Sequence, residues 1–173
     1  MKFFDFKTWN AKKILKEIAL MALVILVVSN VMSYIRQPDL SSSEIPKFNE
    51  LMINGEVFDA REFAGKPLLV HFWATWCPVC KAEADNIERL SQYYNVVTIA
   101  VKSGDDEKVQ QFLTKRDLHY RVINDEEGKW AQTYMIGAYP TSFIYNRNGE
   151  ISFTEVGYTS TLGFYLRMWW AGL

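Results

Sequence analysis

From Ile18 to Ile35 the chain carries no charged side chain, and Leu, Val, Ile, Met and Ala dominate this run. At a rise of 1.5 Å per residue the run would form a helix of roughly 27 Å, close to the ~30 Å hydrocarbon core of a bilayer. We therefore expect a membrane-spanning helix at residues 18–35. The rest of the chain must fold on one side of that membrane.

The charges that flank this segment indicate which side that is. Lysines precede it and only Arg36 follows it directly, so the positive-inside bias places the N-terminus in the cytoplasm and the remainder outside. A cleaved signal peptide and a buried helix of a soluble protein are the alternatives. A signal peptide has a shorter apolar region, about 7–15 residues, before a small-x-small site, and residues 29–34 contain no convincing site of that kind. We predict an uncleaved, single-pass anchor in a bacterial inner membrane.

A polar run bracketed by prolines, Gln-Pro-Asp-Leu-Ser-Ser-Ser-Glu-Ile-Pro, follows the anchor. Its composition favours an extended linker at residues 36–47. At about 3.3 Å per residue the linker reaches roughly 30 Å, which lets the folded domain stand clear of the membrane. The predicted organisation is a cytoplasmic tail at residues 1–17, the anchor, the linker, and one domain at residues 48–173.

The composition limits what this domain can do. Aromatic residues make up 15% of the chain and supply ample core, which excludes a disordered segment. The net charge is -1 and the pI is about 6.1, so the chain offers no basic face for the phosphates of a nucleic acid. We expect no nucleic-acid partner.

Strand-like and helix-like segments alternate within the domain, which is typical of an α/β sheet. We expect strands at residues 68–74, 96–101, 120–123, 141–145 and 151–156, and helices at residues 77–93, 105–116, 127–134 and 161–171. The first of these strands is almost continuously apolar, so it should be buried on both faces. The pairs Asn54-Gly55 and Asn148-Gly149 predict hairpin turns.

Helical spacing predicts which side of two helices faces the sheet. For the helix at 77–93, the residues near one face are Val79, Ile87, Leu90 and, just past its end, Tyr94. In the closing helix at 161–171, we expect Leu162, Leu166 and Trp169 to face the sheet. The alternative for the Trp169-Trp170 pair is contact with a membrane interface, where tryptophan is enriched.

The chain has two cysteines, and they lie three residues apart in Trp76-Cys77-Pro78-Val79-Cys80. A disulfide between them would close a very small ring and add little stability, so chemistry explains the pair better. The pair follows a buried strand at the first turn of a helix, where unpaired N–H groups lower the pKa of a thiol. We predict that Cys77 is the nucleophile and that Cys80 resolves the mixed disulfide.

The stretch from Phe72 to Glu83, Phe-Trp-Ala-Thr-Trp-Cys-Pro-Val-Cys-Lys-Ala-Glu, resembles the active site of membrane-anchored, TlpA-like thioredoxins. Within that group it is most similar to the copper-sensitivity suppressor protein D (ScsD) type, with the cytochrome c maturation thioredoxins as neighbours. The resemblance includes Gly65-Lys66-Pro67 and Gly137-Ala138-Tyr139-Pro140-Thr141. It implies a thioredoxin fold, a central mixed sheet flanked by helices, with one inserted αβ unit at residues 105–123.

The resemblance also implies that Pro140 is cis and faces the disulfide. The backbone of Tyr139 would then be free to pair with an extended substrate segment beside Cys77. A trans proline that opens an edge strand is the alternative. The residues expected to bind substrate are Trp76, Pro78, Tyr139 and Thr141.

Two ionisable residues near the thiols are candidate catalytic groups. His71 takes the strand position where thioredoxins commonly place a buried Asp, so the proton relay of the family does not transfer simply. His71 is either a hydrogen-bonded structural residue or a base that helps to deprotonate Cys80. Glu83 matches an acidic position in the group, and it is either a proton acceptor with a raised pKa or an ordinary solvated side chain.

These observations predict a membrane-anchored periplasmic thiol-disulfide oxidoreductase that reduces protein disulfides and needs no cofactor or metal. The resemblance implies that electrons come from a membrane reductase of the DsbD or ScsB kind. The alternative is a periplasmic copper carrier, because a thiolate pair suits Cu(I). The two Cys and two His of the chain have no spacing typical of a closed zinc site.

Overall fold

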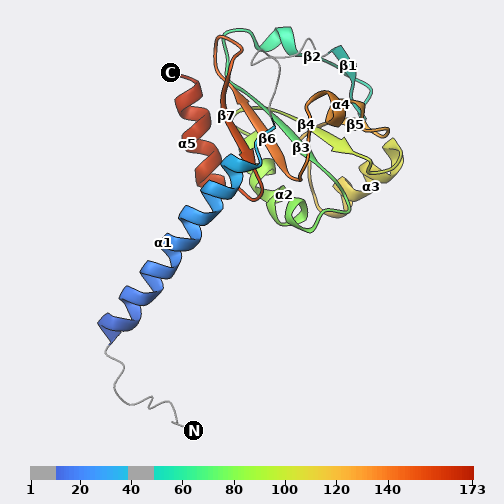
Figure 1. The fold of residues 1–173 in the computed structure, drawn as a ribbon. Helices are drawn as coiled ribbons and strands as arrows, with labels where there is room; N and C mark the ends of the chain where they lie inside the picture. Colours follow the sequence, from blue (N-terminus) through green and yellow to red (C-terminus); the bar gives the residue numbers. More distant parts are fainter. Residues whose placement is uncertain (1–10, 39–48) are drawn as a thin grey trace.

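The computed structural model describes residues 11–38 and 49–173 (Figure 1). The first helix, α1 (Ala11–Ile35), projects from the folded domain, and the segment Lys13–Ile35 is long and apolar enough to cross a membrane. Most of the predicted linker, most of the predicted tail and the first residue of the predicted domain lie outside the described residues.

Within residues 49–173, five strands form a mixed sheet in the order β5-β4-β3-β6-β7. The strands are β3 (Leu68–Trp73), β4 (Asn95–Val101), β5 (Arg121–Asp125), β6 (Thr141–Tyr145) and β7 (Ile151–Val156). The first three of these are mutually parallel, and β6 runs antiparallel to both β3 and β7. A separate hairpin of β1 (Asn49–Leu51) and β2 (Val57–Asp59) precedes the sheet.

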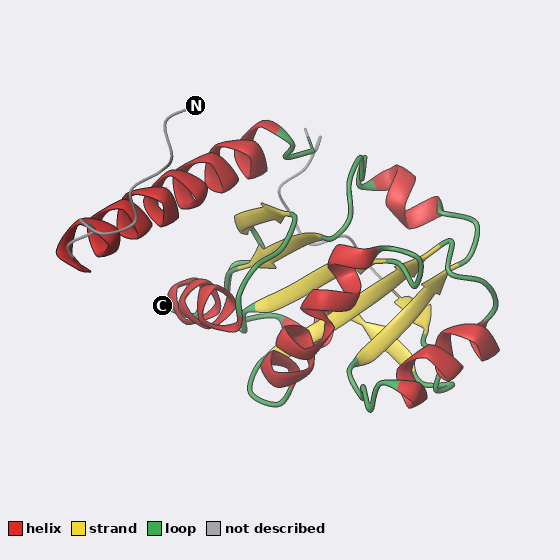
Figure 2. Ribbon diagram, turned by 90° about the horizontal axis from the view of Figure 1, so that it is seen from below, coloured by secondary structure: helices red, strands yellow, loops and turns green. Residues whose placement is uncertain are grey.

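Helices and the hairpin cover the two faces of this sheet (Figure 2). The helices are α2 (Pro78–Ser91), α3 (Asp106–Lys115), α4 (Lys129–Thr133) and α5 (Thr161–Ala171), and η2 (Ala60–Phe63) is one short 3₁₀ turn. One core cluster joins the sheet to α2, α3 and α5. The other joins it to β2, η2 and α4. The inserted αβ unit, α3 with β5, extends one edge of the sheet.

The alternation of side chains along β3 explains why the strand is apolar throughout. Leu69 and Trp73 pack into the first core cluster, whereas Leu68, Val70 and Phe72 pack into the second. All six residues of β3 are buried, as the sequence predicts. The predicted hairpin turns are confirmed too: Gly55 and Gly149 have φ values of +83° and +79°, which a residue with a Cβ rarely adopts.

One predicted helix face is confirmed in part, and the other is wrong. In α2, Ile87 and Leu90 are buried as predicted, whereas Val79 is 41% exposed. The buried face of α2 also contains Cys80, Glu83 and Ala84. In α5, Leu162, Leu166 and Trp169 point away from the sheet, and the buried residues are Phe164, Met168 and Ala171.

The end of α1 contacts the domain directly. The Ser33 hydroxyl accepts a hydrogen bond of 2.9 Å from the Val156 backbone N–H, and the Gln37 side chain donates one of 2.8 Å to the Thr154 carbonyl. Both groups belong to β7, the strand at the edge of the sheet. The linker composition predicts a domain that stands clear of the anchor, and the structure differs because these bonds hold the end of α1 against β7.

Candidate active site

Cys77 lies where β3 gives way to α2, at the carboxyl end of a central strand. It is the N-cap of α2, its Sγ accepts a hydrogen bond of 3.1 Å from the Cys80 N–H, and Pro78 occupies the first helical position. Proline fits there because its missing N–H would be unpaired in any case. The structure holds Cys77 and Cys80 as a disulfide, with 5.3 Å between their Cα atoms.

The position of Cys77 favours a negatively charged sulfur. The N-terminal end of a helix carries a partial positive charge from its unpaired N–H groups, and the first turn of α2 contains no acidic residue to neutralise it. Cys77 and Cys80 are 4% and 3% exposed. The two cysteines are therefore buried to the same extent.

A loop from the far end of the domain closes over the sulfur of Cys77. The Tyr139–Pro140 peptide bond is cis, as the resemblance implies, and the Tyr139 carbonyl oxygen lies 3.6 Å from Cys77 Sγ. Tyr139 precedes β6, so its backbone is not part of the sheet ladder. The Thr141 hydroxyl donates a hydrogen bond to the Ala138 carbonyl and holds the loop in place.

Trp76 forms the exposed rim beside the disulfide. Its ring is 55% exposed and meets the Tyr139 ring edge to face at 5.5 Å between centroids. The indole N–H donates to the Lys102 carbonyl at 3.1 Å, which fixes the ring on the loop after β4. Pro78 is exposed next to it, whereas Thr141 is only 1% exposed. Of the four predicted substrate-binding residues, Thr141 is therefore the one whose side chain a substrate cannot reach.

Glu83 and His71 meet in the core below the disulfide. Glu83 is fully buried, and its Oε1 accepts a hydrogen bond from the Thr159 backbone N–H. Its Oε2 has no hydrogen-bond partner among the described residues and lies 3.7 Å from His71 Nε2. His71 Nδ1 lies 2.8 Å from the Ser142 hydroxyl. The solvated alternative for Glu83 is thus excluded.

Burial has opposite effects on these two groups. It raises the pKa of Glu83 to about 8, with the hydrogen bond from Thr159 opposing the rise and the charge of Glu155 adding to it. It lowers the pKa of His71 to about 3. Near neutral pH His71 is uncharged and Glu83 is mainly protonated, so their contact is not an ion pair. At 3.7 Å it is also too long for a direct hydrogen bond. Of the two, Glu83 has the acidity suited to exchanging a proton with a thiol near neutral pH.

Ser142 and Thr159 position His71 and Glu83 and are not predicted from the sequence. Both lie far along the chain and reach the site only because β6 pairs with β3 and because α5 begins beside α2. No local pattern marks them. Within the described residues, no group of three or more His, Cys, Asp or Glu side chains could hold a metal ion.

Comparisons with known proteins agree with this geometry. A family model described as Redoxin matches residues 40–163. A thioredoxin-like protein of Haemophilus influenzae is 30% identical over 162 residues, covering 92% of this chain and 96% of its own. The thiol-disulfide oxidoreductase ResA of Oceanobacillus iheyensis is 35% identical over 114 residues, 61% of this chain and 59% of its own.

A solved structure shows the same arrangement of helices and strands. It is a thiol:disulfide interchange protein of the thioredoxin family from Chlorobium tepidum, 26% identical, with a TM-score of 0.68 over 78% of this chain and 99% of its own. The thioredoxin fold predicted from the sequence is therefore confirmed.

Proposed function

The chain belongs to the redoxin family, and on that premise we propose that it is a thiol-disulfide oxidoreductase that reduces disulfides of other proteins through Cys77 and Cys80. The observation that carries this proposal is the position of Cys77 Sγ. It lies at the N-terminus of α2 and 3.6 Å from the Tyr139 carbonyl, beside a cis proline.

The reaction moves two electrons from the enzyme dithiol to the substrate disulfide. The Cys77 thiolate attacks one sulfur of the substrate; that disulfide breaks, a mixed disulfide forms, and the departing sulfur takes up a proton. Cys80 then loses its proton and attacks Cys77 Sγ. The mixed disulfide breaks, the second substrate thiolate leaves and is protonated, and the enzyme is left as the Cys77–Cys80 disulfide.

Glu83 is the proposed proton acceptor for Cys80. The two residues lie three apart on α2, so their Cβ atoms are roughly 5–6 Å from each other. Burial raises the pKa of Glu83 to about 8, so the carboxylate form that can accept a proton is the minor one at neutral pH. That carboxylate is a stronger base than an ordinary glutamate and takes a proton from a thiol more readily. Burial lowers the pKa of His71 to about 3, so His71 is the weaker candidate for the proton acceptor. Its contact with Ser142 is proposed to fix the imidazole ring, which packs against Glu83 and holds it in place.

Substrate is proposed to bind as an extended segment along the Tyr139 backbone, as an added strand. Trp76 and Pro78 flank the sulfur and remain exposed to such a segment. Contacts of this kind use main-chain groups more than particular side chains. The site therefore suits several client proteins.

The proposed setting is the periplasmic side of a bacterial inner membrane. The length and composition of α1, together with the lysines before it, support a single-pass anchor at residues 18–35, a tail at 1–17, a linker at 36–47 and the catalytic domain at 48–173. The finer assignment is to the TlpA-like, ScsD type, with a donor of the DsbD or ScsB kind. The sequence from Phe72 to Glu83 supports this assignment. No observation favours the copper carrier.

A trapping experiment tests this function in cells. In full-length protein, Cys80→Ser should accumulate mixed disulfides with client proteins, seen as bands on a non-reducing gel that disappear with reductant. Cys77→Ser is the matched control and should form no adduct and reduce no disulfide. An adduct-free Cys80→Ser protein together with an active Cys77→Ser protein would contradict the mechanism. Labelling of Cys77 by a membrane-impermeant maleimide in intact spheroplasts tests the compartment.

A further inference from the structure

The outward face of α5 and the chain end carry an apolar stripe. Its five residues are each at least 56% exposed and recur at helical spacing: Leu162, Leu166, Trp169, Trp170 and Leu173. The opposite face contains Phe164, Met168 and Ala171, which the sheet and α2 bury. Helix α5 is therefore apolar on two sides, and packing within the domain accounts for only one of them.

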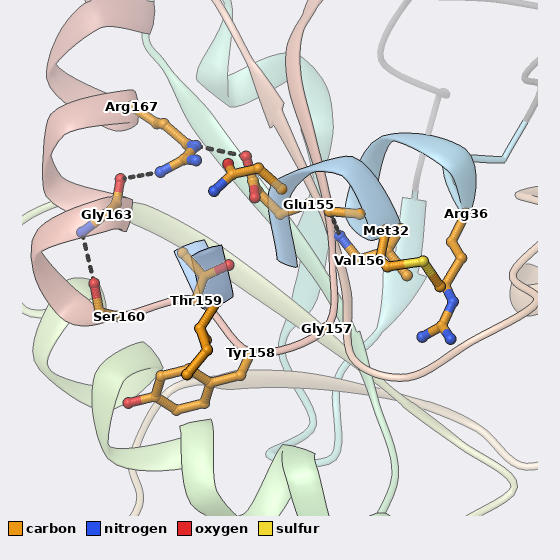
Figure 3. A pocket seen from close by; sticks show the side chains of 13 residues that line it. Met32, Arg36, Glu155, Val156, Gly157, Tyr158, Thr159, Ser160, Gly163 and Arg167 are labelled. Carbon is orange, nitrogen blue, oxygen red and sulfur yellow. Dashed lines mark hydrogen bonds and ion pairs between the residues drawn. The ribbon is translucent and has the colours of Figure 1, made fainter. Parts of the chain in front are cut away.

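The position of α5 beside α1 indicates what meets this stripe. A groove of about 620 Å³ separates the two helices, lined by Ile25 and Met32 from α1 and by Gly163 and Arg167 from α5 (Figure 3). Ile25 precedes the end of α1 by ten residues, or roughly 15 Å of helix. Helix α5 therefore lies alongside the outer part of the apolar helix and not beyond its end. Figures 1 and 2 both show the two helices on the same side of the domain.

We propose that the stripe on α5 lies in the outer interface of the phospholipid bilayer that α1 crosses, as a second membrane contact of the domain. The inference rests on the proposed function in one respect, the placement of α1 across a membrane. A bilayer that surrounds α1 from Ile25 to its end reaches α5 without any further partner. It covers the five apolar side chains that would otherwise face water.

The chemistry around the stripe fits such an interface. Tryptophan and tyrosine are enriched at the level of lipid headgroups, and Trp169, Trp170 and the exposed Tyr34 at the end of α1 supply them. Arg36 is exposed on the groove and can meet a lipid phosphate. Helix α5 has no acidic residue, and its one charged residue, Arg167, faces the groove and pairs with Glu155.

This contact would set the orientation of the active site. Strand β7 runs parallel to β3, and Val156, which binds Ser33 of α1, stands in one row with Thr141 and Phe72. Strands are about 4.8 Å apart, so β7, which the end of α1 contacts, lies roughly 10 Å from the strand that leads to Cys77. Held by both α1 and α5, the domain presents Cys77 close to the membrane surface. Partners that are themselves membrane-bound can reach it there.

Quenching by brominated lipids tests the proposal in full-length protein, with one copy in each lipid nanodisc. Bromine atoms high on the acyl chains of phosphatidylcholine quench tryptophans that touch lipid. Trp9, which precedes α1, is replaced by Phe in every protein compared. The test variant is Trp169→Phe with Trp170→Phe, which keeps the stripe apolar. The matched control is Trp130→Phe in α4, on the other side of the domain (Figure 1).

In the double variant, brominated lipid should quench much less of the tryptophan emission than in the parent. Trp130→Phe should lower the total emission but leave unchanged the amount that brominated lipid quenches. Equal quenching in the double variant and the parent would overturn the proposal. With one copy in each disc, no second copy can shield the two tryptophans, so this result would mean that they do not touch lipid. Resistance of the same protein to alkaline carbonate extraction from membranes reports on α1 separately. Failure there overturns the anchoring, while failure of the quenching alone leaves the proposed oxidoreductase intact.

Discussion

Replacing Glu83 by Gln should change how the stability of the protein depends on pH. Glu83 is fully buried, and its pKa rises from 4.5 to about 8 on folding because burial disfavours the charged carboxylate. Below pH 4.5 the group is protonated in both states, and its raised pKa contributes fully to stability. As the pH rises towards 8, the unfolded chain loses the proton while the folded chain keeps it, so this contribution is lost. Each pKa unit corresponds to about 1.4 kcal/mol, which gives a loss of at most about 5 kcal/mol.

Urea unfolding of the oxidised protein in detergent, followed at pH values from 4.5 to 8.5, measures this dependence. The wild-type free energy of unfolding minus that of Glu83→Gln should fall as the pH rises, because Gln does not titrate. Glu126→Gln, at an exposed position, is the control and should leave the curve unchanged. Titration of His71, whose pKa falls from 6.5 to about 3, affects both proteins below pH 6.5 and cancels in the difference. A difference that stays flat across this range would refute the buried, neutral Glu83.

Three further outcomes are expected. Leu90→Ala removes a fully buried side chain from the core between α2 and the sheet. It should lower the free energy of unfolding in urea by about 2–5 kcal/mol, and a loss below about 1 kcal/mol would contradict that packing. Asp105→Ala removes the side chain that accepts the Lys108 N–H at the start of α3 and should cost about 1 kcal/mol, with Asp105→Asn retaining most of it. Trp76→Ala should lower kcat/KM for a protein disulfide more than for a small aromatic disulfide, and Trp76→Phe should have an intermediate effect. Equal losses for both substrates would show that the Trp76 ring does not bind protein substrates.

The elements that could be predicted from sequence are those with one dominant local cause. Strand β3 is continuously apolar, and glycines form the turns at Gly55 and Gly149. Helix α5 could be located but not oriented, because Leu162 and Leu166 recur at the same helical spacing as Phe164 and Met168. With an apolar residue on both sides, periodicity cannot decide which side meets the sheet.

The candidate site likewise contains some residues that the sequence predicts and others that it does not. Two cysteines three residues apart after a buried strand are visible in the sequence, and the structure joins them at the start of α2. The burial of Glu83 is not visible, because it depends on Thr159 from the start of α5 and on His71 from β3. Contacts between such distant positions follow from the tertiary fold and leave no trace in local spacing.

The hydrogen bonds from Ser33 and Gln37 to β7 have a consequence for a chain that lacks residues 1–37. They occupy backbone groups on the open side of the last strand, where an unpaired edge invites the strand of another molecule. A fragment that begins after Gln37 would expose the Val156 N–H and the Thr154 carbonyl together with the apolar stripe of α5. Helix α1 would therefore also protect this edge from self-association, and fragments made without it would be the forms most prone to pair edge to edge.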